Sequence, residues 1–251
     1  QPNGVILVEG FGSDQVTMKS LASEFARNQW NVFTFDFSGH GRSPGTLTFD
    51  NASTDRLAYQ TLAAIQEFTN ISNLRENKIF LIGHSLGARV ALQTSCLNSQ
   101  IAGLILLGTQ VNLASNLQSE FFTGTSDNNL QWVLSLGPET PKAPILMIRG
   151  SWDDILPPEN AEILFNKLTS GSYDHKNGDF SPTAFNNPVR HQRIIPKLVH
   201  NYEPFSPIVI DHIMNWLNEQ FELNVTASKI PIFRIWTWIL SLAGIFLLLI
   251  G

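Results

Sequence analysis

Cysteine and charged residues are both scarce in this chain of 251 residues. The one cysteine, Cys96, excludes an intramolecular disulfide and a cysteine-ligated zinc site. Charged residues make up 15% of the chain and hydrophobic residues 43%, which excludes an intrinsically disordered chain. The formal net charge is −5, and this disfavours a nucleic-acid-binding protein, because contacts to phosphates usually require a basic surface.

Short apolar runs alternate with helical patterns through most of the chain. Because the apolar runs lack strict alternation, they are typical of strands that are buried on both faces of a sheet. Strands that alternate with helices predict a mostly parallel sheet with right-handed crossovers. We therefore predict one α/β domain over residues 1–223, with helices on both sides of the sheet. The predicted strands are 5–8, 32–35, 78–82, 104–107, 144–148 and 194–199, and the predicted helices are 18–26, 57–68, 86–94, 159–168 and 207–221.

The end of the chain is uncharged and apolar. Residues 235–251 would span about 26 Å as a helix, close to the thickness of a bilayer core. Trp236 and Trp238 suit the membrane interface, and Arg234 can extend toward water. We predict a linker at 224–229, a transmembrane segment at 230–251 and a membrane location, with the side of the membrane left open. A buried core helix is the alternative.

The strongest local motif is Gly83-His84-Ser85-Leu86-Gly87. It follows a predicted strand and opens a predicted helix, which is the context of a nucleophile elbow. In such a turn the serine hydroxyl stands above the edge of the sheet, and the flanking glycines avoid steric clashes. We predict that Ser85 is a nucleophile and that His84 points away from it. The alternative is a glycine-rich turn in which Ser85 caps the helix.

A serine nucleophile needs a base, because the free hydroxyl is barely ionised at neutral pH. His200 directly follows the predicted strand 194–199, and the carboxyl ends of parallel strands are where ligands gather. We predict His200 as the general base, with His191 as the reserve candidate. The remaining histidines are His40, His84, His175 and His212.

The histidine in turn needs an acid that holds its tautomer and stabilises the imidazolium. Asp153 and Asp154 follow the predicted strand 144–148, again at a carboxyl end. We predict Asp153 as this acid; the alternative for either residue is a loop aspartate that caps the next helix. The resulting order along the chain is nucleophile, acid and base, which is the order of one known class of hydrolases.

An oxyanion hole requires two backbone N–H groups that point at the developing charge. We predict that one comes from Leu86, directly after the nucleophile, and the other from Phe11, between Gly10 and Gly12 in the loop after the first strand. A phosphate-binding loop is the competing interpretation of these glycines. It is disfavoured because no third glycine stands at the dinucleotide spacing and no Gly-Lys-Ser/Thr follows.

These motifs together resemble the α/β-hydrolase superfamily over residues 4–222. The turn at 36–43, Asp-Phe-Ser-Gly-His-Gly-Arg-Ser, is similar to the branch of monoacylglycerol-lipase-like esterases and serine aminopeptidase-like hydrolases. Many members have His-Gly where this chain has Glu9-Gly10. Two strands that members usually carry before the first one are missing, so we expect a truncated N-terminus. Residues 109–142 would occupy the position of the family's lid, and their length predicts an open site.

The chemistry and the resemblance predict a serine hydrolase that cleaves carboxylic esters through an acyl-enzyme. Its expected partners are a small-molecule ester or acyl substrate and a membrane at the C-terminal helix, without nucleic acid, metal or cofactor. Two alternatives stay open: an amide or peptide hydrolase of the serine aminopeptidase type, and a non-catalytic binding module with the hydrolase fold. Substrate identity and oligomeric state are left open by the sequence.

Overall fold

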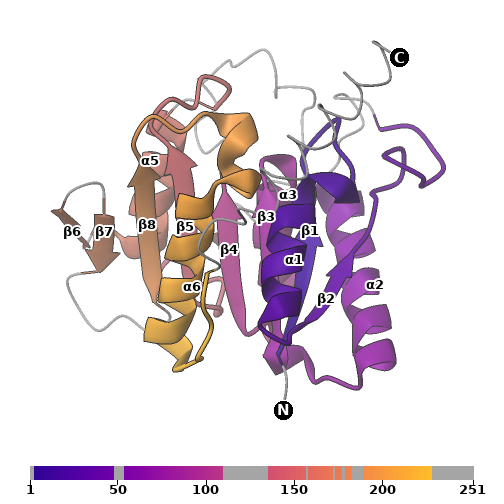
Figure 1. The fold of residues 1–251 in the computed structure, drawn as a ribbon. Coiled ribbons are helices and arrows are strands. Elements are labelled where there is room, and N and C mark those ends of the chain that lie inside the picture. The colour runs from indigo at the N-terminus through magenta and orange to yellow at the C-terminus, as the bar shows by residue number, and fades with distance from the viewer. Residues whose placement is uncertain are drawn as a thin grey trace, which may run out of the picture.

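The protein, represented here by a computed structural model, folds around an eight-stranded sheet (Figure 1). The structure describes residues 3–47, 54–109, 135–156, 158–171, 173–176, 179–182 and 189–227. Along the sheet the strands follow the order β2-β1-β3-β4-β5-β8-β7-β6. The six strands from β2 to β8 in this order are parallel, and β7 and β6 continue the sheet in antiparallel fashion. The strands are β1 (Gly4–Val8), β2 (Asn31–Thr34), β3 (Ile79–His84), β4 (Gly103–Leu107), β5 (Ile145–Gly150), β6 (Tyr173–Lys176), β7 (Asp179–Pro182) and β8 (Arg190–Ile195).

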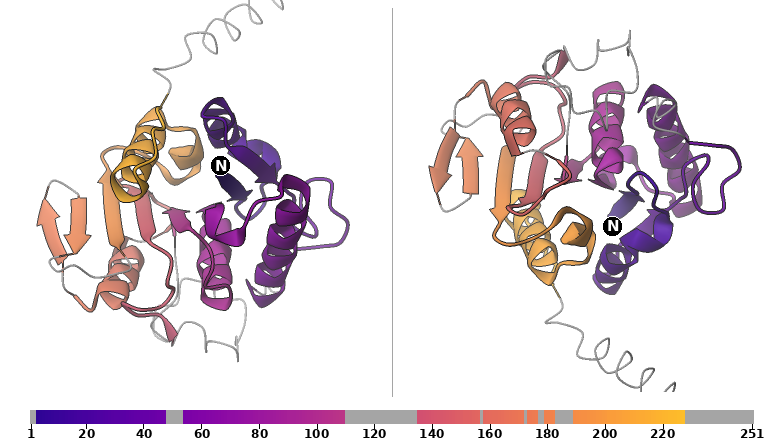
Figure 2. Two further views of the ribbon diagram at one scale, coloured as in Figure 1. Left: turned by 90° about the horizontal axis from the view of Figure 1, so that it is seen from below. Right: turned by 90° about the horizontal axis from the view of Figure 1, so that it is seen from above.

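Helices cover both faces of the sheet, as Figure 2 shows from above and below. Helices α1 and α6 lie on one face, and α2, α3 and α5 lie on the other. This confirms the predicted class, a mostly parallel sheet flanked by helices. The α-helices are α1 (Lys19–Arg27), α2 (Thr54–Ser72), α3 (Leu86–Leu97), α5 (Pro158–Thr169) and α6 (Pro207–Phe221), and short 3-10 helices are η1 (Gln15–Met18), η3 (Glu76–Lys78) and η4 (His200–Phe205).

The parallel strands are apolar on both sides because each side packs against a helical layer. Within β1, Ile6 and Val8 belong to the core under α2, α3 and α5, whereas Val5 and Leu7 belong to the core under α1 and α6. All four side chains are at most 1% exposed. Burying such a side chain stabilises the fold by about 1.5–3 kcal/mol, so the two clusters account for the sheet's continuous apolar runs.

The strand order reverses between β1 and β3, and this reversal determines where a site can form. From β1 the chain moves outward to β2 through α1, then crosses back to β3 and moves the other way through α3. In register, Val8 pairs with Gly83, so the loops after β1 and β3 leave the sheet at the same level. In open α/β sheets the crevice at such a reversal is the usual ligand site.

The prediction of a strand at 194–199 was wrong. Strand β8 spans Arg190–Ile195, and a hairpin of β6 and β7 extends the sheet beyond it, which the sequence did not predict. The buried positions of β8 include Arg190 and Gln192, which are polar and hide the apolar pattern of a strand. Arg190 is 1% exposed and its guanidinium donates to the carbonyl oxygens of Ala143 and Pro141. Hydrogen bonds to the backbone thus replace the apolar contacts that would have marked this strand.

Helix α6 begins as predicted, with the Ser206 hydroxyl accepting from the Val209 N–H and a proline at the first position. After α6 the chain packs back on the domain: Val225 is buried, and the Asn28 side chain bonds to the backbone of Thr226. These contacts include the first residues of the predicted linker. None of the helices within the described residues is long and apolar enough to cross a bilayer. The predicted transmembrane segment, 230–251, lies outside the described residues.

Candidate active site

Ser85 occupies the turn between β3 and α3 in a strained conformation. Its φ and ψ are 55° and −118°, in a region that a residue with a side chain rarely adopts. A Cβ on Gly83 would collide with the carbonyl of Gly87, which explains why glycine flanks the turn. The Ser85 side chain makes no capping bond to α3, which leaves its hydroxyl available and disfavours the alternative of an ordinary helix cap.

Asp153 and His200 form a buried hydrogen-bonded pair, although 47 positions separate them in the chain. The distance from His200 Nδ1 to Asp153 Oδ2 is 2.8 Å. His200 is 2% exposed and Asp153 is 8% exposed. An ionised carboxylate can only accept, so Nδ1 carries the proton and Nε2 is left as an acceptor. The structure therefore brings together the predicted acid and the predicted base.

Backbone hydrogen bonds hold the loop of Asp153 against the loop of His200. The Ser151 N–H donates to the Ile195 carbonyl (2.8 Å), and the Trp152 N–H donates to the Leu198 carbonyl (3.0 Å). A Cβ on Gly150 would collide with the same Leu198 carbonyl, so the close approach of the two loops requires glycine. The second oxygen of Asp153 accepts from the N–H groups of Ile155 and Leu156, which fixes the carboxylate in its loop.

A cavity of about 790 Å³ lies at the carboxyl end of the sheet. Ser85 and His200 both line it, as does Phe11, one of the two predicted oxyanion donors. A Cβ on Gly10 would lie 3.3 Å from Ser85 Cβ, so the loop after β1 passes directly beside Ser85. Leu86, the other predicted donor, is the first residue of α3, where backbone N–H groups lack partners within the helix.

The sequence predicted that His84 points away from Ser85 and gave no sign that its ring would lie against His200. His84 lines the same cavity, and its ring lies 4.7 Å from the ring of His200. Its Nε2 faces the carbonyl oxygen of His200 at 3.1 Å. Burial and the positive charge that His200 can carry lower the pKa of His84 to about 3. His84 is therefore neutral at physiological pH and donates a hydrogen bond from Nε2–H to the His200 carbonyl oxygen.

Glu203 is a part of this cluster that the sequence did not reveal. It lies one turn after His200 in η4 and is fully buried. Its Oε1 accepts from the Gly150 N–H at 2.8 Å, while Oε2 lies 3.7 Å from His84 Nε2 and has no hydrogen-bond partner among the described residues. Burial raises the pKa of Glu203 well above its usual value. Glu203 follows His200 by three positions, which could have suggested that the two lie close together, but this spacing does not reveal that Glu203 is buried.

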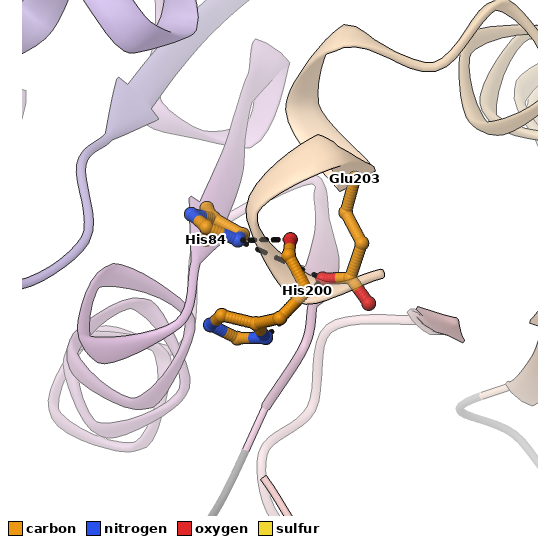
Figure 3. A group of neighbouring side chains, drawn as sticks. All are labelled: His84, His200 and Glu203. Carbon is orange, nitrogen blue, oxygen red and sulfur yellow. Dashed lines mark hydrogen bonds and ion pairs between the residues drawn. The ribbon is translucent and has the colours of Figure 1, made fainter. Parts of the chain in front are cut away.

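Three potential metal ligands meet here, since the ligand atoms of His84, His200 and Glu203 lie within 4.8 Å of one another (Figure 3). The two imidazoles are already engaged, one with a backbone carbonyl and the other with Asp153. A metal would have to break both bonds, and the raised pKa of Glu203 disfavours the ionised carboxylate that a metal needs. The donor set fits a hydrogen-bonded histidine cluster better than a metal centre.

Replacing Glu203 with glutamine should increase stability progressively as the pH rises. Because the pKa of Glu203 is raised in the folded state, unfolding releases its proton above about pH 4.5, and wild-type stability falls with rising pH. Glutamine cannot ionise, so the variant should gain up to about 1.4 kcal/mol over wild type per pH unit in this window. Urea unfolding between pH 5 and pH 8 measures the difference.

The matched control is Glu67→Gln, on the exposed side of α2, which should show no such trend. If the Glu203→Gln variant instead lost stability relative to wild type as the pH rose, Glu203 would be an ionised, stabilising group and the assignment of its proton would be wrong.

The remaining predictions about the site are placed as follows. His191 lies in β8 and is not among the described residues that line the cavity. His212 lies in α6 and His40 in the turn after β2. The predicted lid, 109–142, falls mostly outside the described residues, which resume at Ser135.

The sequence of this chain matches a known family. A family described as serine aminopeptidase, S33, matches residues 2–138. A protein of Mycoplasma genitalium named as an esterase/lipase is 30% identical over 138 residues, which cover 52% of this chain and 48% of that protein. A Candida albicans protein named protein phosphatase methylesterase 1 is 35% identical over 100 residues, 39% of this chain and 26% of that protein. The chain thus spans about half or less of the length of these relatives.

Solved structures share the fold at low sequence identity. An esterase of Pyrococcus furiosus aligns with a TM-score of 0.66 at 18% identity, covering 87% of this chain and 82% of that one. A monoacylglycerol lipase of Paleococcus ferrophilus aligns with a TM-score of 0.60 at 19% identity, covering 87% of this chain and 96% of that one. With the elbow, the strand order and the family match in agreement, the chain belongs to the serine aminopeptidase S33 family of the α/β-hydrolase superfamily.

Proposed function

We propose that the protein is a serine hydrolase that cleaves carboxylic esters through an acyl-enzyme. The observation that carries the proposal is the buried Asp153–His200 pair beside a strained Ser85, with Ser85 and His200 lining one cavity. The relatives named as esterases support an ester substrate, since they share the family and the fold.

In the proposed reaction His200 Nε2 takes the proton of the Ser85 hydroxyl as Oγ attacks the ester carbonyl. The carbonyl oxygen becomes an oxyanion, which the N–H groups of Phe11 and Leu86 stabilise. His200 then gives its proton to the leaving alcohol, and the acyl-enzyme forms. Water, deprotonated by His200, attacks the acyl carbon, and His200 returns the proton to Ser85 Oγ as the serine–acyl bond breaks and the acid is released. Asp153 holds Nδ1–H throughout and stabilises the imidazolium.

The cavity favours an apolar acyl group. Phe11, Ile155 and Phe205 contribute apolar walls around Ser85 and His200. Burying each methylene of an acyl chain contributes about 0.8 kcal/mol, so these walls can select by chain length. The name monoacylglycerol lipase on one structural relative fits such a substrate, as does the expected position of the domain near a membrane.

An amide bond of a peptide is the second candidate, and the description of the family as serine aminopeptidases favours it. The same three residues would serve, because acyl transfer from an amide passes through the same oxyanion. Turnover of an ester and an amide that share the same acyl group separates the candidates. Faster cleavage of the ester does not decide between them. Measurable cleavage of an amide whose acyl part is a residue with a free N-terminus would favour the peptidase.

Labelling with a fluorophosphonate probe tests the proposal directly. The wild-type chain should form a covalent adduct on the peptide that contains Ser85, and Ser85→Ala should form none. Mass spectrometry of the digested protein locates the adduct. Absence of labelling in a folded wild-type chain would favour a binding module, and equal labelling of both proteins would identify another serine as the nucleophile.

The membrane location rests on the sequence alone. We propose that residues 230–251 attach the domain to a bilayer, as the uncharged run at 235–251 predicts. Membrane fractionation of the full chain and of a chain that ends at residue 227 tests this: only the full chain should require detergent for extraction.

A further inference from the structure

A second carboxyl–histidine pair lies beside the candidate active site. His40 Nδ1 lies 2.8 Å from Glu9 Oε1, and both residues are buried, at 6% and 1% exposed. The pair joins the loop after β1 to the turn after β2, 31 positions apart in the sequence. Glu9 stands where many members of the superfamily have histidine, and nothing in the proposed reaction uses either residue.

The hydrogen bonds of His40 determine its tautomer. The Gly12 N–H donates to His40 Nε2 at 3.3 Å, and a backbone N–H can only donate. The proton of the neutral ring therefore sits on Nδ1 and is donated to Glu9. Burial lowers the pKa of His40, which keeps the ring neutral although Asp36 and Asp14 lie close enough to act in the opposite direction.

Glu9 is organised to stay protonated. Its Oε1 accepts from His40 and also from the Phe37 N–H at 3.0 Å. Its Oε2 is buried and has no hydrogen-bond partner among the described residues. Burial, assisted by the nearby charges of Asp36 and Asp14, raises the pKa of Glu9 to about 8. The pair is therefore neutral on both sides, and glutamine can imitate the protonated carboxyl.

The two hydrogen bonds of His40, one to Glu9 and one from the Gly12 N–H, both attach to the short loop that carries Phe11. Glu9 precedes Phe11 by two positions, and Gly12, which bonds to His40, follows it directly. The Phe11 ring also packs edge-on against the His40 ring, with 5.8 Å between centroids. Gly12 has a φ of 67°, so the loop bends sharply just after Phe11. The loop is thus held on both sides of the proposed oxyanion donor.

We propose that Glu9 and His40 are a positioning pair that holds residues 9–13 so that the Phe11 N–H points at the oxyanion beside Ser85. The inference rests on the proposed function, because only a reaction with an oxyanion gives this loop a catalytic role. The side chains act through the backbone and do not touch the substrate. Their loss should therefore lower kcat and leave KM nearly unchanged.

The test compares an aryl butyrate with its thionoester, which carries C=S in place of C=O. Sulfur is a weak hydrogen-bond acceptor, so an intact oxyanion hole favours the oxygen ester. His40→Ala should lower kcat on the oxygen ester by roughly 10- to 100-fold, less than the 10²- to 10³-fold typical of removing a donor outright. The preference for oxygen over sulfur should fall by a similar factor, which a loss of stability alone would not cause.

Three further variants keep the test informative if His40→Ala folds poorly. In His40→Asn the amide can still donate to Glu9 from the position of Nδ1 but cannot reach the Gly12 N–H, so the oxygen preference should still fall. Glu9→Gln retains the acceptor for His40 and Phe37 and should keep kcat within about 3-fold of wild type, whereas Glu9→Ala should match His40→Ala. His212→Asn, in α6, is the control and should resemble wild type.

The outcomes separate this inference from the function on which it rests. Unchanged oxygen preference in folded His40→Ala and His40→Asn, with an active wild type, would overturn the positioning pair alone. A wild type that neither turns over the ester nor labels at Ser85 would overturn the proposed function, and the pair's role with it.

Discussion

Ser85→Ala, His200→Ala and the double variant are all expected to lower kcat for ester hydrolysis by about the same factor, on the order of 10⁶. The reason is that the two residues perform one step together in the proposed reaction. Without the base, the hydroxyl keeps its proton and attacks poorly; without the hydroxyl, the base has no proton to take. Removing the second residue after the first therefore costs little more, and the residual rate comes from the oxyanion hole and binding alone.

Steady-state kinetics on one aryl ester, with circular dichroism as a check of folding, measures these rates. His191→Ala is the matched control, because His191 was the reserve base and lies in β8 outside the residues that line the cavity. It should keep kcat within about 3-fold of wild type, since surface and strand substitutions away from a site act mainly on stability. A large loss in His191→Ala with little loss in His200→Ala would reverse the assignment of the base.

Asp153→Asn is expected to lower kcat by roughly 10⁴ while the protein stays folded. The asparagine oxygen can still accept from the N–H groups of Ile155 and Leu156, which preserves the loop. Its amide nitrogen would face His200 Nδ1 in place of the carboxylate oxygen that now lies 2.8 Å away. Because an amide N–H donates, Nδ1 would have to accept, and the proton would move to Nε2. A ring protonated on Nε2 cannot take the proton of Ser85.

Asp154→Asn is the control for this prediction, because Asp154 is the exposed neighbour that the sequence could not fully separate from Asp153. It should leave the rate close to that of wild type. Measuring kcat against pH adds a second criterion: Asp153→Asn should remain slow at every pH at which it is folded, because the fault is the tautomer and not the charge of the ring. Recovery of the wild-type rate at high pH would contradict this explanation.

Local signals predicted the elements that carry the site. The glycines around Ser85, the apolar run before them and the helical spacing after them predicted a strand, a tight turn and a helix, and the structure has β3, Ser85 and α3 in that order. Asp153 was found for the same reason, since it follows the apolar run that forms β5. The sequence paired His200 with Asp153, and the structure places the two within hydrogen-bonding distance although the strand expected before His200 was misplaced.

The misplaced strand and the missed hairpin share a physical cause. Polar side chains are buried in β8, and the pattern of apolar residues in the sequence does not reveal their burial. Strand β8 places Arg190 and Gln192 in the interior, and the terminal guanidinium nitrogens of Arg190 donate to carbonyl oxygens of the segment before β5. A periodicity of apolar residues cannot detect such a strand. The hairpin of β6 and β7 was missed as well; within the described residues it joins the sheet through β8.

The sequence by itself determined the fold class, the family resemblance and the three residues expected to react, because each depends on short-range chemistry: apolar periodicity, glycine at a strained turn, and polar residues at the ends of strands. Only the tertiary structure decided that His84 and Glu203 pack against His200, and that Glu9 pairs with His40 beside Phe11. These partners come from different loops at one end of the sheet. Their protonation states follow from burial, which arises only when the whole chain has folded.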